Sequence, residues 1–243
     1  MKRNLILIGK LFLLVMLHTV APDIWTMDGE SIRFFGIPFP LRMTIVRLPD
    51  QRLWLHSPVR PSKEQLAALQ VLGSTAFLVA PNAFHHLYIG HWQEHFPEAQ
   101  IWGVSKLKQK RPELHFSGIL DETAETPWQP HIEQIYFRGS AILPEMMFWH
   151  RSTKTLILTD YIQNHDTGND GWFWRRLKRI IGVEGPQGGV PLDLRLSVWH
   201  RRAARDSLQQ LMQWDFERII IAHGNCIEGN GREYLQKAFE WLQ

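Results

Sequence analysis

The sequence predicts an α/β fold, a sandwich built on mixed β-sheets. Short apolar runs rich in β-branched residues occur along the whole chain, and segments with helical spacing separate them in its later part. The 243 residues, 44% of them hydrophobic, are enough for one large core, so a single domain is favoured. We therefore predict one domain over residues 21–243, preceded by an accessory segment or a mis-assigned start at 1–20.

The predicted elements follow from local patterns. The runs 43–48 and 53–56 predict a hairpin. Ser62 and Gly73 mark the start and the end of a predicted helix. The Gly and Pro residues of 32–39 predict a loop or an edge strand there. The charged, Pro-containing stretch 106–130 is expected to hold turns and a short strand. A strand and a turn are predicted within 23–29, and the other predicted strands are 43–48, 53–56, 76–80, 100–104, 132–137, 146–149, 155–159 and 218–222. The predicted helices are 64–72, 87–96, 172–181, 200–214 and 232–242.

The composition excludes several classes of function. A net charge of +3 is too small to indicate nucleic-acid binding, and the 11 Trp residues show no ladder of aromatic and basic residues. The single cysteine, Cys226, excludes an intramolecular disulfide framework or a multi-cysteine metal site, and it fits a reducing compartment.

The N-terminus has a basic start and an apolar run, as a signal peptide does. Lys10 interrupts the run, which is far shorter than the ~20 residues of a membrane span. We expect a cytoplasmic protein, with export or membrane association through residues 1–20 as the alternative.

Three strand-like runs end in residues that bind metals. The run at 77–80 leads to His85 and His86, the run at 155–159 leads to Asp160, and the run at 218–222 leads to His223. The ends of buried strands meet at one edge of a sheet, so these side chains are expected to lie together. Imidazoles and a carboxylate form a ligand set suited to Zn, Fe or Mn.

These positions and the order of the elements resemble the metallo-β-lactamase superfamily. Three stretches, 42–48, 53–58 and 82–86, resemble one bacterial and plant branch whose domain has no assigned activity. The resemblance implies an αββα sandwich of two mixed β-sheets that binds one or two metals at the shared sheet edge. It also implies a motif His-x-His-x-Asp-His, a later His, an Asp at a strand end, and a final His before Gly.

The motif transfers to this chain only in part. When His86 is aligned with the last residue of the motif, His85 replaces the Asp, and Ala83 and Pro81 replace the first two imidazoles. The later His, expected near 139–141, is absent from the sequence, and His56 stands where an Asp is usual. Of the two metal positions that the resemblance implies, one therefore loses its imidazoles. The other keeps His86, Asp160 and His223 and gains His85.

We therefore predict a single divalent metal, zinc before iron or manganese, bound by His85, His86, Asp160 and His223. Asn82 and His56 are candidates for positioning these ligands. His56 and Glu145 are candidates for moving a proton, and Glu145 is also a candidate substitute ligand.

The predicted function is metal-dependent hydrolysis of a small-molecule substrate. The alternatives are a non-catalytic binding protein, a relic fold that has lost its metal, and an iron-dependent oxidoreductase. The oligomeric state is not predicted.

Two further segments have weaker patterns. His165 lies in a polar loop that is interpreted as solvated. The basic, aromatic helix 172–181 has the composition of an anion-, membrane- or partner-binding helix, but a solvated face backed by core aromatics is the favoured interpretation.

Overall fold

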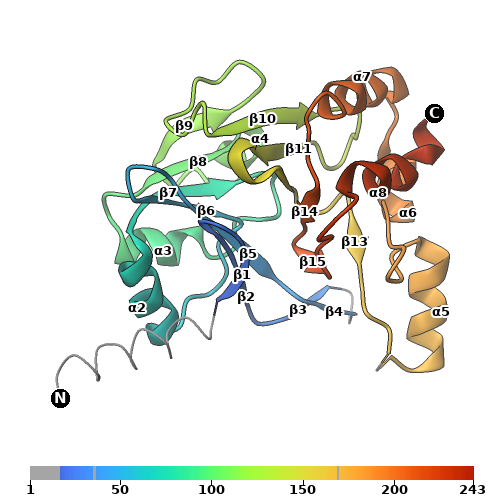
Figure 1. Cartoon of the computed structure of the whole chain (residues 1–243), viewed down its shortest axis with the longest axis horizontal. Coiled ribbons are helices and arrows are strands. Elements are labelled where there is room, and N and C mark those ends of the chain that lie inside the picture. Colours follow the sequence, from blue (N-terminus) through green and yellow to red (C-terminus); the bar gives the residue numbers. More distant parts are fainter. Residues whose placement is uncertain (1–16, 35–36, 169) are drawn as a thin grey trace. The chain divides into compact units, whose positions relative to one another are not determined.

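The computed structural model describes residues 17–34, 37–168 and 170–243, which form two compact units (Figure 1). The first unit contains the described residues up to Ala80 and Phe84–Ile119. The second contains Pro81–Ala83 and Leu120–Gln243. None of the helices in the described ranges combines the length and the apolar character of a membrane span.

The first unit is built on a mixed sheet of seven strands within the described residues, in the order β1-β2-β5-β6-β7-β8-β9. The pairs from β1 to β6 are antiparallel, whereas β6–β7 and β7–β8 are parallel. The strands are β1 His18–Ala21, β2 Ile24–Asp28, β5 Arg42–Arg47, β6 Arg52–His56, β7 Ser74–Ala80, β8 Gln100–Val104 and β9 Phe116–Leu120. The predicted hairpin is confirmed as β5–β6.

A separate two-stranded hairpin occupies the segment predicted as a loop or an edge strand. It consists of β3 Ile32–Phe34 and β4 Ile37–Phe39, paired antiparallel. This hairpin is not part of the seven-stranded sheet.

Three helices belong to the first unit: α2 Lys63–Leu72, α3 Ile89–His95 and α4 Ser105–Lys110. Ser62 begins α2 with a capping box, because its Oγ accepts from Gln65 N–H at 3.2 Å and its own N–H donates to Gln65 Oε1 at 2.8 Å. Helix α4 was missed because Leu107 is its only buried residue, so the charged sequence shows no helical periodicity.

The second unit contains a mixed sheet in the order β10-β11-β12-β14 and a two-stranded sheet of β13 and β15. Strand β12 is antiparallel to β11 and parallel to β14, so a long crossover connects β12 and β14. The strands are β10 Ile132–Phe137, β11 Glu145–His150, β12 Thr155–Ile157, β13 Gln163–Asn164, β14 Arg218–Ile220 and β15 His223–Gly224.

Four α-helices and two 3-10 turns complete the second unit in the described residues. Buried aromatic rings pack between its elements, with Phe137 and Tyr161 centred 4.6 Å apart and Phe137 and Phe239 5.2 Å apart. The helices are α5 Trp172–Ile181, α6 Leu192–Ser197, α7 Arg201–Leu211 and α8 Gly231–Ala238, with 3-10 turns η1 Arg151–Thr153 and η2 Glu240–Leu242. Helix α6 was not predicted, and η2 follows α8 where one continuous helix was expected.

The capping box of α2 provides a test of the first unit. Replacing Ser62 by Ala removes the acceptor for Gln65 N–H, and we expect this to lower the free energy of unfolding by about 1 kcal/mol in urea titrations. Ser105→Ala is the matched control, because α4 has no side-chain cap. An equal loss in both variants would contradict the capping role of Ser62.

Candidate metal centre

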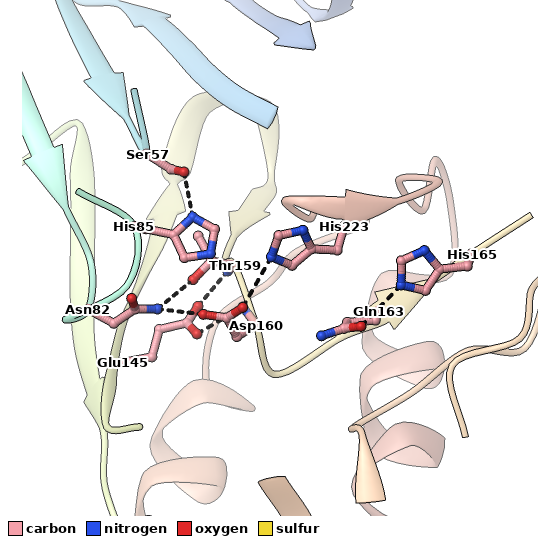
Figure 2. Close-up of polar contacts among 9 residues, drawn as sticks. All are labelled: Ser57, Asn82, His85, Glu145, Thr159, Asp160, Gln163, His165 and His223. Carbon is pink, nitrogen blue, oxygen red and sulfur yellow. Dashed lines mark hydrogen bonds and ion pairs between the residues drawn. The ribbon is translucent and has the colours of Figure 1, made fainter. Parts of the chain in front are cut away.

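Asp160 follows strand β12, and the buried Glu145 holds its backbone in place (Figure 2). The Thr159 N–H donates to Glu145 Oε1, and the Asp160 N–H donates to Glu145 Oε2 at 3.0 Å. Glu145 begins β11, and β11 pairs with β12. The carboxylate therefore fixes the turn at which Asp160 leaves the sheet.

Burial raises the pKa of Glu145 to about 7, and the neighbouring Asp160 charge acts in the same direction. The two backbone N–H bonds oppose this rise. Because both oxygens accept from backbone groups, the geometry gives Glu145 a positioning role. Its predicted roles as a base or a substitute ligand stay predictions.

Asn82 orients the Asp160 side chain. Its Nδ2 donates to Asp160 Oδ2 at 2.8 Å and to Thr159 Oγ1 at 3.0 Å. Asn82 is fully buried, and Met146 N–H donates to the carbonyl of the preceding Pro81 at 2.9 Å. Asn82 therefore holds the Asp160 carboxylate, as Figure 2 shows, whereas the sequence predicted it as a partner of a ligand imidazole.

His223 faces the other oxygen of Asp160. Its Nε2 lies 3.1 Å from Asp160 Oδ1, and the two side chains are 4% and 14% exposed. The second unit thus brings together two of the four predicted ligands.

Gly224 allows the tight pairing that places His223. Strand β15 lies parallel to β13, with Gln163 opposite His223 and Asn164 opposite Gly224. Gly224 has a φ of +101°, and a Cβ atom there would lie 2.1 Å from the Asn164 carbonyl oxygen. Only glycine fits this left-handed, crowded position.

In the first unit, the nearly buried His85 is fixed by Ser57. Its Nδ1 lies 2.6 Å from Ser57 Oγ (Figure 2). Ser57 directly follows β6, and its N–H donates to the Val79 carbonyl at 2.9 Å. Ring orientation by a hydrogen bond at one nitrogen is typical of histidines that bind metal through the other.

His86 has a different environment from His85. Its Nδ1 accepts from Arg111 Nη1 at 2.9 Å. Burial, together with the charges of Lys110 and Arg111, lowers the pKa of His86 to about 4. The positive charge of the Arg111 guanidinium disfavours a metal cation beside it. This argues against His86 as a ligand, and its ligand role stays a prediction.

His56 is buried in strand β6. Its ring stacks on Trp54 with centroids 5.3 Å apart and an interplanar angle of 13°. Burial holds the pKa of His56 well below its usual value, with a further contribution from His85, so the ring is neutral. Its predicted role in proton transfer is not tested by this geometry.

The expectation that His165 lies in a solvated loop is wrong. The residue is 8% exposed, its Nε2 lies 3.1 Å from Gln163 Oε1, and its N–H donates to the Val183 carbonyl at 2.9 Å. Burial lowers the pKa of His165 to about 4. Sequence reasoning also missed Ser57 and Gln163, because hydrogen bonds between distant side chains leave no local pattern.

Residues 22–167 match the model of a family described as Domain of unknown function (DUF4336). This stretch is more than half of the 243 residues. The chain belongs to the DUF4336 family. The match contains Asn82, Glu145 and Asp160 and ends before His223. A search of curated proteins finds no match to this DUF4336 chain.

Solved structures similar to this DUF4336 chain have the metallo-β-lactamase fold. A metallo-β-lactamase from Pontibacter korlensis is 12% identical, with a TM-score of 0.63 over 93% of this chain and 98% of its own. The mono-zinc form of FIM-1 from Pseudomonas aeruginosa is 12% identical, with a TM-score of 0.60, and the match covers 93% of this chain and 95% of FIM-1. The flavodiiron protein from Giardia intestinalis is 13% identical, with a TM-score of 0.68 over 93% and 59%. The predicted fold class is confirmed.

Gly224 gives a test of how His223 is placed. We expect Gly224→Ala to lower the free energy of unfolding by at least about 1–2 kcal/mol, because alanine disfavours this backbone and its Cβ meets Asn164. Gly229→Ala is the control, since no atom lies within 4 Å of a Cβ there. Equal thermal stability of the two variants would show that the position tolerates a side chain.

Glu145 gives a second test. Glu145→Gln turns one acceptor into a donor that faces a backbone N–H, so we expect a loss of about 1–3 kcal/mol in urea unfolding. Glu122→Gln, which removes an exposed ion pair with Arg138 at 3.0 Å, should cost no more than about 1 kcal/mol. A loss no larger than this control would refute the positioning role of Glu145.

Proposed function

We propose that this protein is a metal-dependent hydrolase with a single divalent metal, zinc before iron or manganese. The observation that carries the proposal is the Asp160–His223 pair. A carboxylate oxygen and an imidazole nitrogen 3.1 Å apart have nearly the spacing of neighbouring ligands on one ion, about 3.3 Å for tetrahedral bonds of ~2.0–2.1 Å.

His85 is proposed as the third ligand on grounds of chain connectivity. Asn82 binds Asp160 directly, and His85 is three residues further along the chain. Three residues span at most about 11 Å, so the chain length allows His85 to reach an ion bound by Asp160. Because Ser57 engages Nδ1, His85 would bind the ion through Nε2.

The donor set fits a catalytic metal. Two imidazoles and one carboxylate are the ligands of hydrolytic zinc sites, which keep a fourth position for water. Asn82 holds one Asp160 oxygen and Ser57 holds one His85 nitrogen, so the remaining donor atoms are oriented before the ion binds. His86 is the weaker candidate, because its Nδ1 accepts from Arg111, which leaves the proton of the neutral ring on Nε2, the nitrogen that would have to bind the ion.

The protein side chains have defined roles in this proposal. Zinc bound at such a site lowers the pKa of its water from ~16 towards ~7 and polarises the scissile bond. Glu145 and Asn82 keep the Asp160 carboxylate in a fixed direction. His56, which is buried and neutral, and the buried Glu145 are kept as candidate proton carriers.

The substrate is proposed to be a small molecule with an ester, amide, thioester or phosphodiester bond. FIM-1 is a metallo-β-lactamase in a mono-zinc form, which agrees with a single ion, and the flavodiiron protein keeps iron as an alternative. A cytoplasmic location is part of the proposal, since the sequence has a single cysteine.

A non-catalytic binding protein on the same fold is the second candidate. It is favoured by the exposure of Trp172 and Phe173, at 78% and 54%, on helix α5. This candidate predicts that metal-free and metal-loaded protein behave alike towards every hydrolysable probe.

The test measures metal content and hydrolysis in the purified full chain. We expect about one equivalent of zinc by mass spectrometry in the wild type. Asp160→Asn, His223→Ala and His85→Ala should each lower zinc content by about ten-fold or more, because one of three protein ligands is lost. A panel of chromogenic esters, thioesters, phosphodiesters and β-lactams then tests the loaded protein.

His150→Ala is the matched control, because His150 is a buried histidine of the second unit whose Nδ1 bonds to Thr153 Oγ1 at 2.8 Å. It should keep its zinc. Equal zinc content in the wild type and the three ligand variants would refute the site. If the wild type binds zinc but hydrolyses no probe, with or without excess zinc in the assay, the result would favour the non-catalytic binding protein.

A further inference from the structure

Helix α5 exposes the aromatic residues that the sequence analysis assigned to the core. None of its ten residues is buried. Trp172 is 78% exposed, Phe173 54%, Trp174 38% and Ile180 63%. The expectation of core aromatics behind a solvated face is therefore wrong, and this surface needs another explanation.

The exposed residues of α5 are arranged by helical spacing. Phe173 and Ile180 are seven residues apart, so they lie on one face, with Arg176 between them at steps of three and four. Trp172 lies one turn before Arg176 on the same side. Leu177 and Ile181 are half-buried, and Leu177 stands four residues after Phe173. The exposed apolar strip, with Arg176 in it, therefore runs along the edge of the half-buried side of the helix.

The charges of α5 are all of one sign. The helix contains Arg175, Arg176, Lys178 and Arg179 and no acidic residue. Lys178 and Arg179 pair with Asp170 and Glu184, at 2.7 and 2.6 Å, in the segments on either side of the helix. Arg176 is exposed and lies among the apolar side chains, where an anionic partner would meet both kinds of group.

We propose that α5 is an interfacial helix by which the protein docks on a membrane surface containing anionic lipids. Trp rings prefer the interface between headgroups and acyl chains, and Phe and Ile gain free energy by entering the apolar layer beneath. Arg176, which is exposed among these apolar side chains, would meet the lipid phosphates. At about 15 Å, ten helical residues lie on a bilayer rather than span its ~30 Å core.

The charges argue against a second copy of this chain as the occupant. Two α5 helices brought together about a two-fold axis would gather the cations of both helices in one interface, with no acidic residue of either helix to pair with them. An acidic protein would satisfy Arg176 but does not explain the exposed Trp172, Phe173 and Ile180 beside it, which suit a deformable lipid layer. The inference does not depend on the proposed metal centre.

The experiment is sedimentation of the full-length protein with vesicles. We expect binding to vesicles of equal parts phosphatidylcholine and phosphatidylglycerol, and much weaker binding to phosphatidylcholine alone. Phe173→Ser with Ile180→Ser should weaken binding by at least about ten-fold, because two apolar side chains no longer enter the bilayer. Arg176→Glu should weaken vesicle binding by at least about five-fold, and a higher salt concentration should also weaken it.

The control variants are Val71→Ser and Lys108→Glu. Val71 is 43% exposed on α2, and Lys108 is an exposed cation on α4, so each removes the same kind of group from another helix. Both should bind vesicles as the wild type does.

Three outcomes would overturn the proposal. They are no binding of the wild type to anionic vesicles, an equal loss of binding in the controls, and unchanged binding in the α5 variants, which would assign docking to another segment. Self-association that the Phe173/Ile180 variant abolishes, without vesicle binding, would make the surface an interface between copies. Thermal unfolding of each variant shows whether the fold is intact.

Discussion

The direction of the Asp160 carboxylate is the constraint around which the second unit is organised. Strand β12 brings the residue to the sheet edge, Glu145 binds the backbone beside it, and Asn82 holds one of its oxygens. Glu145 is completely buried, and an unbonded carboxyl group there would cost several kcal/mol, on the order of 2–7. Its two backbone bonds offset that cost, so the same contacts stabilise the fold and orient the side chain that faces His223.

The superfamily motif that this sequence resembles places imidazoles where the chain has Pro81 and Ala83. The structure uses that segment differently. The Pro81 carbonyl accepts from Met146 N–H, and the next residue, Asn82, donates to the Asp160 side chain. The residue between the two positions that carry imidazoles in the motif here holds a neighbouring carboxylate.

The strand ends were predictable because apolar, β-branched runs stand directly before Asp160 and His223 in the sequence. Contacts made at long range were not predictable. Nothing near Ser57 in the sequence indicates that its hydroxyl bonds to His85, 28 residues away. Short elements with few buried residues, such as α4, also leave no periodic pattern. Helix α5 was placed correctly from its spacing, but its exposure depends on the residues that pack around it, which periodicity does not report.

The excursion of Pro81–Ala83 has a consequence for how the protein can be divided. The chain leaves the first unit after Ala80, contributes three residues to the second, and returns at Phe84. A fragment that begins at residue 120 would therefore keep every helix and strand of the second unit but lose Asn82. Gene fusions, split-protein designs and limited proteolysis that separate the halves would leave Asp160 without that amide partner. The two units are thus not interchangeable modules, and any exchange between family members must carry the three residues along.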